Sequence, residues 1–358
     1  MGRKFMEHRV NIIVAAYNAE HTINRSLKSI QKQTYKNWKC IIVNDGSTDK
    51  SLEICEKFVQ KDSRFIVISQ ENQGAAKAKL RGIKESKDCE YICFCDADDK
   101  LDKKYLDKLL LEAVKNNADL VVSNVKKMLG AIKFNTFIPE CCKRYGIYEH
   151  EQIMKNLYIS YFGITNLPGY LPGKLYKTEL LKLIQNKEAV VRFMADDLCI
   201  NIQIIPNVKK MVIVPEQYYY YRIGGGTSKF MPTFMQDYYA YHQLQCEMIE
   251  KYDLEYKFTQ YSDIEIINVA WSWFNMCAGI GKYTDQKLKV EMKRIRELPL
   301  INLALINLID KEYDKKQFLN NFFNKDYDTM IRKLREEMYR RESGIKVKLK
   351  KKIMKIIK

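Results

Sequence analysis

Three aspartates stand within four positions of the segment "FCDADDK". Asp96, Asp98 and Asp99 follow an apolar run, Tyr91 to Cys95, that is typical of a buried strand. Carboxylates this close repel one another unless a cation lies between or beside them. A hard divalent cation prefers carboxylate and phosphate oxygens, and Mg2+ typically takes one or two protein carboxylates together with phosphates and water. The segment is therefore a candidate metal site.

A helix cap is the alternative explanation for these aspartates. Asp98 or Asp99 would cap a helix that begins near Asp102, and the remaining charge would be solvated. Capping accounts for one carboxylate of the three. It does not account for Asp96, which follows directly on the buried strand, so metal binding and capping both stay open on these residues alone.

A second acidic pair, Asp196 and Asp197, precedes a segment with Leu198, Ile202 and Ile205 at helical spacing. Negative charge in the first turn of a helix is stabilised by the helix dipole, and the residues alone favour that role. A carboxylate can also act as a general base, which contributes about 10^2 to 10^4 in rate.

Apolar, β-branched runs alternate with helical patterns over the first 125 residues. The predicted strands are Val10 to Ala16, Cys40 to Val43, Phe65 to Ile68, Tyr91 to Cys95 and Leu120 to Val125. Apolar residues at helical spacing lie between them: Ile23, Leu27 and Ile30; Leu52, Cys55 and Val59; Leu106, Leu110 and Ala113. The alternation predicts a doubly wound α/β fold with a mostly parallel sheet and helices on both faces.

Ligands of such a sheet bind beyond the carboxyl ends of its strands. The polar segments there are Tyr17-Asn18, Asn44 to Ser47, Gln70 to Asn72 and Asp96 to Asp99, and we expect them to border one crevice. The first turn, "AAYNAEHTI", has no glycine for a G-x-G-x-x-G phosphate cradle, and no G-x-x-x-x-G-K-[ST] loop occurs in the chain. A bound nucleotide phosphate would therefore need another source of positive charge.

Composition limits the class of protein. The 358 residues exceed one ordinary domain, which predicts two or three units. The ten cysteines contain no C-x-x-C pair, which favours free thiols in a reducing compartment. The amino terminus has no signal-peptide pattern, and no window reaches about 18 apolar residues. We expect a cytoplasmic protein whose membrane contact, if any, is peripheral.

The chain closely resembles the inverting family 2 glycosyltransferases of GT-A fold, of the bacterial surface-polysaccharide type. The resemblance is carried by three motifs in order: "VNIIVAAYNAEHTINRSLKSIQKQTYKNWKCIIVNDGSTDKS", "ENQGAAKAKLRGI" and "CFCDADDKLDKKYL". It covers residues 10 to about 125, and extends more weakly to about residue 228 through "MADDLCINIQI" and "YYYYRIGGGTS".

The resemblance assigns the metal site. It implies that Asp98 is the ligand of Mn2+ or Mg2+, and that Asp96 contacts the nucleotide ribose and the water shell of the metal. The metal would stabilise the negative charge that develops on the departing nucleoside diphosphate. Without a glycine cradle the diphosphate needs this metal, and the metal needs the acidic cluster.

The resemblance also assigns a nucleotide-sugar site. Asp45 would bond the uracil ring, and Ala15 and Tyr17 would pack around the base, with Asn18 beside them. Asn72 and Lys79 fall where the family recognises the nucleotide and its phosphates, although the family usually has Arg-Asn where this chain has Lys79-Leu80.

The family has Glu-Asp at the second acidic pair, and its Asp is the base. By resemblance Asp197 is the catalytic base, and Asp196 contacts the acceptor. Arg222 and the glycines Gly224 to Gly226 would close the site over the diphosphate, or would form only a solvated turn.

The basic charge of the chain, formally +17, is concentrated at its carboxyl end. Residues 311–358 contain 16 Lys plus Arg against 7 Asp plus Glu. As a helix, the last residues would place Ile345, Leu349, Ile353, Ile356 and Ile357 opposite the lysines. This amphipathic pattern favours an anionic membrane surface over a disordered tail or nucleic-acid contact.

Four regions follow from these interpretations. We expect a nucleotide-sugar-binding half (residues 1–125), an acceptor-binding half (126–228), a helical region (229–342) and a basic amphipathic tail (343–358). The predicted function is metal-dependent transfer of a sugar, with inversion, from a UDP-sugar to a glycan or lipid-linked saccharide acceptor. The alternative is a non-catalytic nucleotide-sugar-binding or scaffold protein of the same fold. No nucleic-acid partner is expected.

Overall fold

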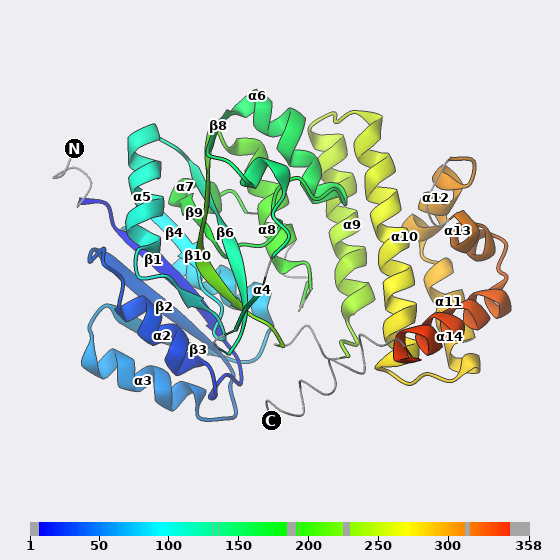
Figure 1. Ribbon diagram of the computed structural model, residues 1–358, viewed down its shortest axis with the longest axis horizontal. Helices are drawn as coiled ribbons and strands as arrows, with labels where there is room; N and C mark the ends of the chain where they lie inside the picture. The colour runs from blue at the N-terminus through cyan, green and yellow to red at the C-terminus, as the bar shows by residue number, and fades with distance from the viewer. Residues whose placement is uncertain are drawn as a thin grey trace. The chain divides into compact units, whose positions relative to one another are not determined.

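The computed structural model describes residues 7–130, 132–134, 136–184, 191–192, 194–224, 230–311 and 316–343. By its internal contacts the chain divides into two compact units (Figure 1). The sheet unit comprises residues 1–226 and 250–252, and the helical unit comprises residues 227–249 and 253–358. The predicted amphipathic tail beyond residue 343 lies outside the described residues.

A ten-stranded mixed sheet lies at the centre of the sheet unit. Its order is β3-β2-β1-β4-β9-β6-β10-β5, with β7 paired to β6 and β8 paired to β10. The strands are β1 (Val10–Ala16), β2 (Trp38–Asp45), β3 (Phe65–Gln70), β4 (Tyr91–Phe94), β5 (Lys100–Leu101), β6 (Leu120–Leu129), β7 (Ile132–Phe134), β8 (Gly146–Glu149), β9 (Lys174–Lys177) and β10 (Lys210–Arg222).

The five predicted strands are confirmed as β1, β2, β3, β4 and β6. The first four pair in parallel, as expected for a doubly wound fold. The second half of the sheet is mixed, because β9 lies between β4 and β6 and pairs antiparallel with both. This short strand follows a loop rich in proline and glycine and carries lysines at both ends, so it has no apolar run that predicts it.

Helices cover both faces of the sheet. They are α2 (Ile23–Gln31), α3 (Ser51–Lys61), α4 (Ala75–Glu85), α5 (Tyr105–Asn116), α6 (His150–Gln152), α7 (Thr178–Leu181) and α8 (Asp196–Ile204). Ile12 and Val14 of β1 belong to the large core that includes α2, α3 and α5. Ala15 points the other way, into a smaller cluster with Ala78 of α4. The two-residue period of a strand thus supplies both cores.

Helix α4 was not predicted from apolar periodicity. The residues that it buries include Ala76, Ala78 and Gly82, which are too small to produce an apolar stripe. A Cβ atom at Gly82 would lie 2.4 Å from Cγ2 of Ile13, so the helix backbone lies directly on the sheet. This close packing holds Lys79, on the same helix, near the carboxyl ends of the strands.

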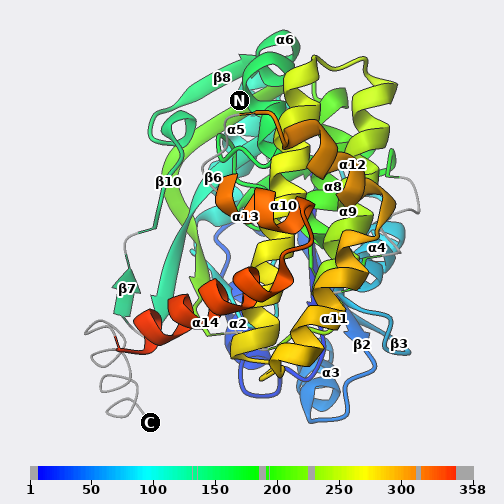
Figure 2. The ribbon, with the colours of Figure 1, turned by 90° about the vertical axis from the view of Figure 1, so that its right-hand side faces the viewer.

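The described part of the second unit is helical, as expected. Its helices are α9 (Phe234–Lys251), α10 (Tyr256–Gly279), α11 (Asp285–Arg296), α12 (Pro299–Leu308), α13 (Lys316–Phe323) and α14 (Tyr327–Ser343). The long helix α10 contacts α11, α12 and α14 (Figure 2).

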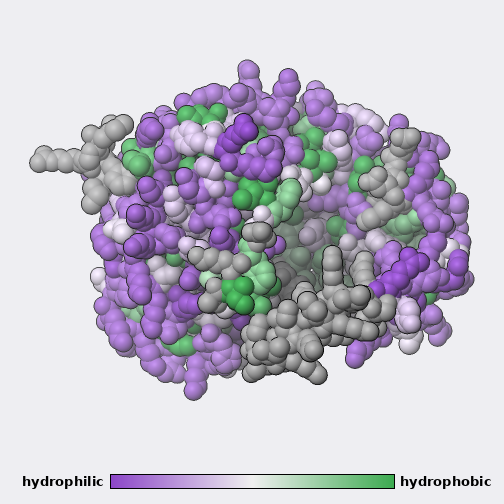
Figure 3. Space-filling model, viewed as in Figure 1, coloured by the Kyte–Doolittle hydropathy of each residue, from purple (hydrophilic) through white to green (hydrophobic). Residues whose placement is uncertain are grey.

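Two sequence expectations about the whole chain can be compared with the structure. All ten cysteines are free thiols, as expected. No helix among the described residues is long and apolar enough to span a bilayer. The face shown in Figure 3 is mostly hydrophilic, with hydrophobic residues in small groups.

A buried polar network joins α9 to α10. Gln245 Nε2 donates to Glu265 Oε2 (2.6 Å), and the Ser262 hydroxyl bonds to Gln245 Oε1 (2.8 Å) and to His242 Nδ1 (2.9 Å). Burial raises the pKa of Glu265 to about 7 and lowers the pKa of His242 to about 4. Protonated Glu265 and neutral His242 are therefore the forms that the folded helices favour.

Replacing Glu265 by Gln should remove one pH dependence of stability. The folded pKa of Glu265 lies above its unfolded value of about 4.3, so its contribution is present below that pH and is lost as the pH rises through about 7. We expect Glu265→Gln to be more stable than the wild type at pH 8, by roughly 1–3 kcal/mol, and the gain to be clearly smaller at pH 5. Thermal unfolding followed by circular dichroism at both pH values measures this.

Glu255→Gln is the matched control, because the Glu255 side chain is 71% exposed. It should leave the difference between pH 5 and pH 8 unchanged. A gain in stability from Glu265→Gln that is equal at both pH values would contradict the pH dependence assigned to Glu265.

Candidate active site

The acidic loop after β4 is held by its backbone. Asp99 N donates to Asp96 O (3.1 Å), the Ser26 hydroxyl donates to Asp96 O (3.2 Å), and Arg25 Nη2 donates to Asp98 O (2.7 Å). These bonds use main-chain oxygens only. The carboxylates of Asp96 and Asp98 are therefore left to face the rest of the site, and Asp98 Oδ2 lies 3.9 Å from Arg222 Nη1.

Asp99 supports the loop and is not a helix cap. It is fully buried, and it accepts from the Tyr219 hydroxyl (2.8 Å) and from Arg222 N (2.7 Å). The Tyr219 oxygen in turn accepts from Asp96 N (3.0 Å). Before α5, the backbone N–H of Lys104 donates to the side chain of Asp102. Neither Asp98 nor Asp99 caps this helix, so the capping alternative is wrong.

Lys79 joins α4 to the second acidic pair. Its Nζ lies 2.6 Å from Asp196 Oδ2 and 2.6 Å from Asp197 Oδ1, and the residue is only 6% exposed. Burial alone would lower the pKa of Lys79, but the carboxylates of Asp196, Asp197 and Asp96 raise it well above its ordinary value. Lys79 is a permanent cation at the centre of the site, and the phosphate contact expected of it stays a prediction.

The two carboxylates at the start of α8 differ in their surroundings. Asp196 is 9% exposed, and burial raises its pKa although Lys79 opposes the shift. Asp197 is more open, and its Oδ2 accepts from Leu171 N (3.1 Å). Both occupy the first turn, where the helix dipole also favours them.

Negative charge exceeds positive charge in this part of the molecule. Burial raises the pKa of Asp96 to about 7; Lys79 lowers it, and the neighbouring carboxylates raise it further. Burial also raises the pKa of Asp98. A divalent cation at these oxygens would relieve that repulsion, so the donor set fits a hard metal ion.

The described residues do not hold three candidate ligands together. Among them, no group of three His, Cys, Asp or Glu side chains lies close enough to bind a metal. Asp96 and Asp98 would thus supply two carboxylates, and phosphate and water oxygens would complete the shell, as is common for Mg2+.

Asp45 organises the loop after β3. It is 2% exposed and accepts from Gln73 N (2.9 Å), Gly74 N (2.9 Å) and Gln70 Nε2 (2.8 Å). Asn72 Nδ2 donates to the Asp45 carbonyl oxygen (3.0 Å). Two predicted site residues, Asp45 and Asn72, are therefore brought together, and the expected contact of Asp45 with uracil stays a prediction.

The residues that end β1 lie beside the loop after β2. Asn18 has φ +46°; its N–H donates to the Ser47 hydroxyl (3.1 Å), and its Oδ1 accepts from Thr48 N (2.9 Å). Tyr17 is 47% exposed, and Ala15 packs on the α4 side of the sheet. Tyr17 is open to a ligand, whereas Asn18 holds a loop.

Several contributing residues were missed from the sequence. Tyr219 lies in "YYYYRIGGGTS", where the sequence assigned it no role of its own, and Leu171 contributes through its backbone. Lys174 ends the segment "NLPGYLPGK", whose prolines and glycines are typical of a loop; residues 166–173 form a loop, with Leu167 and Leu171 buried. Of the predicted glycine hinge, Gly224 has φ +92°, and Gly225 and Gly226 lie outside the described residues.

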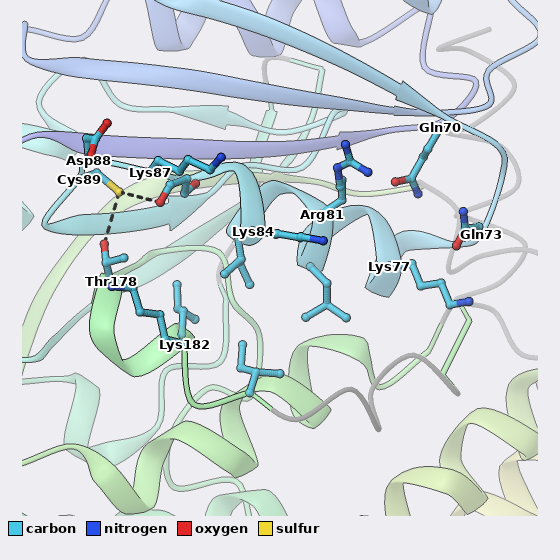
Figure 4. Close-up of a pocket in the computed structure, with 15 residues that line it drawn as sticks. Gln70, Gln73, Lys77, Arg81, Lys84, Lys87, Asp88, Cys89, Thr178 and Lys182 are labelled. Atoms are coloured by element: carbon cyan, nitrogen blue, oxygen red, sulfur yellow. Dashed lines mark hydrogen bonds between the residues drawn. The ribbon is translucent and has the colours of Figure 1, made fainter.

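A groove of about 940 Å³ lies beside α4 (Figure 4). Basic side chains line it, among them Lys77, Lys84 and Lys182. Of the polar segments expected to border the ligand crevice, Gln70 lines this groove, and none of the acidic residues of the site does. The groove is therefore a surface separate from the acidic site, and its lysines provide control positions.

Replacing Lys79 by Met should destabilise the protein. The change leaves Asp196 and Asp197 without their shared cation, and breaking a buried ion pair in this way costs about 3–5 kcal/mol; the partial exposure of Asp197 reduces this to roughly 2–4 kcal/mol. Urea unfolding of the two proteins at pH 7 measures the difference.

Lys77→Met, on the groove side of the same helix, is the matched control. It should change the unfolding free energy by less than about 0.5 kcal/mol. Equal stability of the Lys79 and Lys77 variants would show that the bridge contributes nothing.

Residues 11–165 match the model of a family described as Glycosyl transferase family 2. Over 229 residues, 62% of this chain, 30% of positions are identical to glycosyltransferase GlyA of Streptococcus pneumoniae and 29% to cholesterol galactosyltransferase of Borreliella burgdorferi. The chain spans 32% of the first relative and 63% of the second.

Among solved structures, S. aureus TarS 1-349 in complex with UDP-GlcNAc is similar to this chain. The TM-score is 0.65 at 21% identity, over 94% of this chain and 93% of that one. This likeness shows a shared fold, which includes the sheet and the helices that follow it.

Proposed function

We propose, from the premise that residues 11–165 belong to glycosyl transferase family 2, that this protein transfers a sugar from a UDP-sugar to a hydroxyl of a glycan acceptor. Transfer would depend on a divalent metal and would invert the sugar. The observation that carries the proposal is the acidic loop after β4, which faces Lys79, Asp196 and Asp197 across a buried network of charge.

Asp96 and Asp98 are the proposed metal ligands. Both carboxylates are buried or half-buried, and negative charges outnumber positive charges around them. Burial raises the pKa of both. Bound Mn2+ or Mg2+ would supply Lewis-acid stabilisation of the diphosphate leaving group. Arg222 Nη1, 3.9 Å from Asp98 Oδ2, would add positive charge beside the same phosphates.

Asp197 is the proposed general base. Its Oδ1 accepts from Lys79 Nζ and its Oδ2 accepts from a backbone N–H, so its carboxylate is fixed in direction. A fixed carboxylate can take the proton from an attacking hydroxyl. Asp196 is deeper and bonds to the same lysine, and in this proposal it would meet the acceptor beside Asp197.

Asp45, Asn72, Ala15, Tyr17 and Asn18 form the proposed nucleoside side of the donor site. Asp45 and Asn72 fix one loop, and Asn18 fixes the other. The half-exposed Tyr17 ring lies at the end of β1, where a base can pack on it.

We infer that the acceptor is a lipid-linked saccharide in cell-surface polysaccharide synthesis, and that the enzyme works at the cytoplasmic face of the membrane. This rests on the family and on the basic amphipathic pattern of residues 343–358. The competing proposal, a non-catalytic nucleotide-sugar-binding protein, has no need of a fixed base at Asp197.

A panel of UDP- and GDP-sugars with and without Mn2+, assayed for release of the nucleoside diphosphate, tests the function. We expect UDP release from one UDP-sugar, and its loss with excess EDTA or in Asp98→Asn. Turnover that persists without metal would refute the role of Asp98. Asp88→Asn, on an exposed loop, should match the wild type.

Asp197→Asn separates an enzyme from a binding protein. We expect transfer to fall by about 10^2 to 10^4, since the base is removed, while UDP binding measured by calorimetry stays within a few-fold of the wild type. Full transfer activity in Asp197→Asn would refute the assignment of Asp197 as the general base. Absence of turnover with every sugar, together with UDP binding, would favour the binding protein.

A further inference from the structure

Lys174 is a buried lysine for which the proposed chemistry has no direct use. It is 0% exposed, at the start of β9 in the middle of the sheet. Its Nζ donates to Pro168 O (2.5 Å) and lies 5.7 Å from the centre of the Tyr170 ring. Within the described part of the chain, no carboxylate forms an ion pair with it.

A buried lysine of this kind lowers the stability of the fold. Moving an ammonium out of water without an ion-pair partner carries a large desolvation penalty, and burial lowers the pKa of Lys174 to about 7, with Asp197 opposing the shift. Methionine fills a similar volume with no charge to desolvate. A residue that destabilises the fold where an apolar residue of the same size would not is a candidate for a functional role.

The bond from Lys174 fixes the loop that faces Asp197. Lys174 Nζ holds the carbonyl of Pro168, and Asn201 Nδ2 holds the carbonyl of Gly169 (2.8 Å) and that of Asp197 (3.0 Å). Two residues further on, Leu171 N donates to Asp197 Oδ2 (3.1 Å). The loop is thus bound on one side to the sheet and α8, and on the other to the carboxylate.

The loop packs closely against α8 and the sheet. A Cβ atom at Gly169 would lie 2.4 Å from Leu198 Cδ2, and Gly173 has φ +77°. Asn201 is itself held, because its Oδ1 accepts from the Tyr176 hydroxyl (2.9 Å). The bonds from Lys174 and Asn201 to the neighbouring carbonyls of Pro168 and Gly169 are side-chain links that bear on how the Leu171 N–H faces Asp197.

We propose that Lys174 is a positioning residue: its bond to Pro168 O directs the Leu171 N–H at Asp197 and so orients the base. The inference rests on the proposed function, because Asp197 is the base only there. It adds a residue whose role is to keep the carboxylate oriented, and Asn201 has a similar role from α8.

Lys174→Met and Lys174→Gln test the inference in the full chain. Met removes the donor, whereas Gln keeps an N–H donor without the charge. With the UDP-sugar that reacts fastest in the panel above, we expect kcat of Lys174→Met to fall about 10- to 100-fold, with KM for the donor and the affinity for UDP within two-fold. Lys174→Gln should recover to within about three-fold of the wild type.

Two further measurements distinguish positioning from support of the fold. In protein labelled with 15N-leucine, the Leu171 amide resonance should shift in Lys174→Met and return in Lys174→Gln. The thermal midpoint of Lys174→Met at pH 6 should be no lower than that of the wild type, because a buried charge is removed. Lys177→Met, on the same strand but with a side chain that is 39% exposed and pairs with Asp119, is the control for the resonance and should leave the Leu171 amide unshifted.

Wild-type kcat in Lys174→Met overturns the inference, and so does a fall in kcat that Lys174→Gln shares in full. A lower thermal midpoint together with lost UDP binding assigns Lys174 to the fold and also overturns it. Full activity of Asp197→Asn would show that the proposed base is wrong. An inactive Asp197→Asn together with a fully active Lys174→Met would show that only the role of Lys174 is wrong. In the Asp197→Asn background, Lys174→Met should cause no further loss.

Discussion

The bridge from Lys79 to Asp196 and Asp197 is the interaction on which the rest of the site depends. One buried ammonium bonds to two carboxylates and offsets part of the repulsion between them and the nearby Asp96. It also connects α4, in the half of the sheet that carries the acidic loop, to α8 in the other half. Buried ion pairs seldom stabilise a fold more than apolar residues would, so their value here lies in the specific arrangement they impose.

That arrangement depends on the sheet. The parallel strands β1, β2, β3 and β4 place their polar loops at one edge, as an open α/β sheet requires. The insertion of β9 between β4 and β6 then brings the loop before it to Asp197. The proposed donor site is built from the parallel half, and the support of the proposed base is built from the antiparallel insertion.

Sequence reasoning succeeded where one segment carries its own pattern. Strand β1 matches its apolar run, and α2, α3 and α5 match their three- and four-residue spacings. It failed at α4 and β9. The first buries alanine and glycine against the sheet, and the second is four residues long with lysines at its ends, so neither has a local period to detect.

By itself, the sequence determined which residues carry charge and at which strand ends they stand: Asp96, Asp98, Asp197 and the absence of a glycine cradle are all visible in it. Only the tertiary structure decided which of these charges meet. Lys79 and Asp196 are 117 positions apart, and their contact exists because α4 packs directly on the sheet. Local patterns arise from backbone geometry within a few residues, whereas ion pairs between distant segments depend on packing that no single segment encodes.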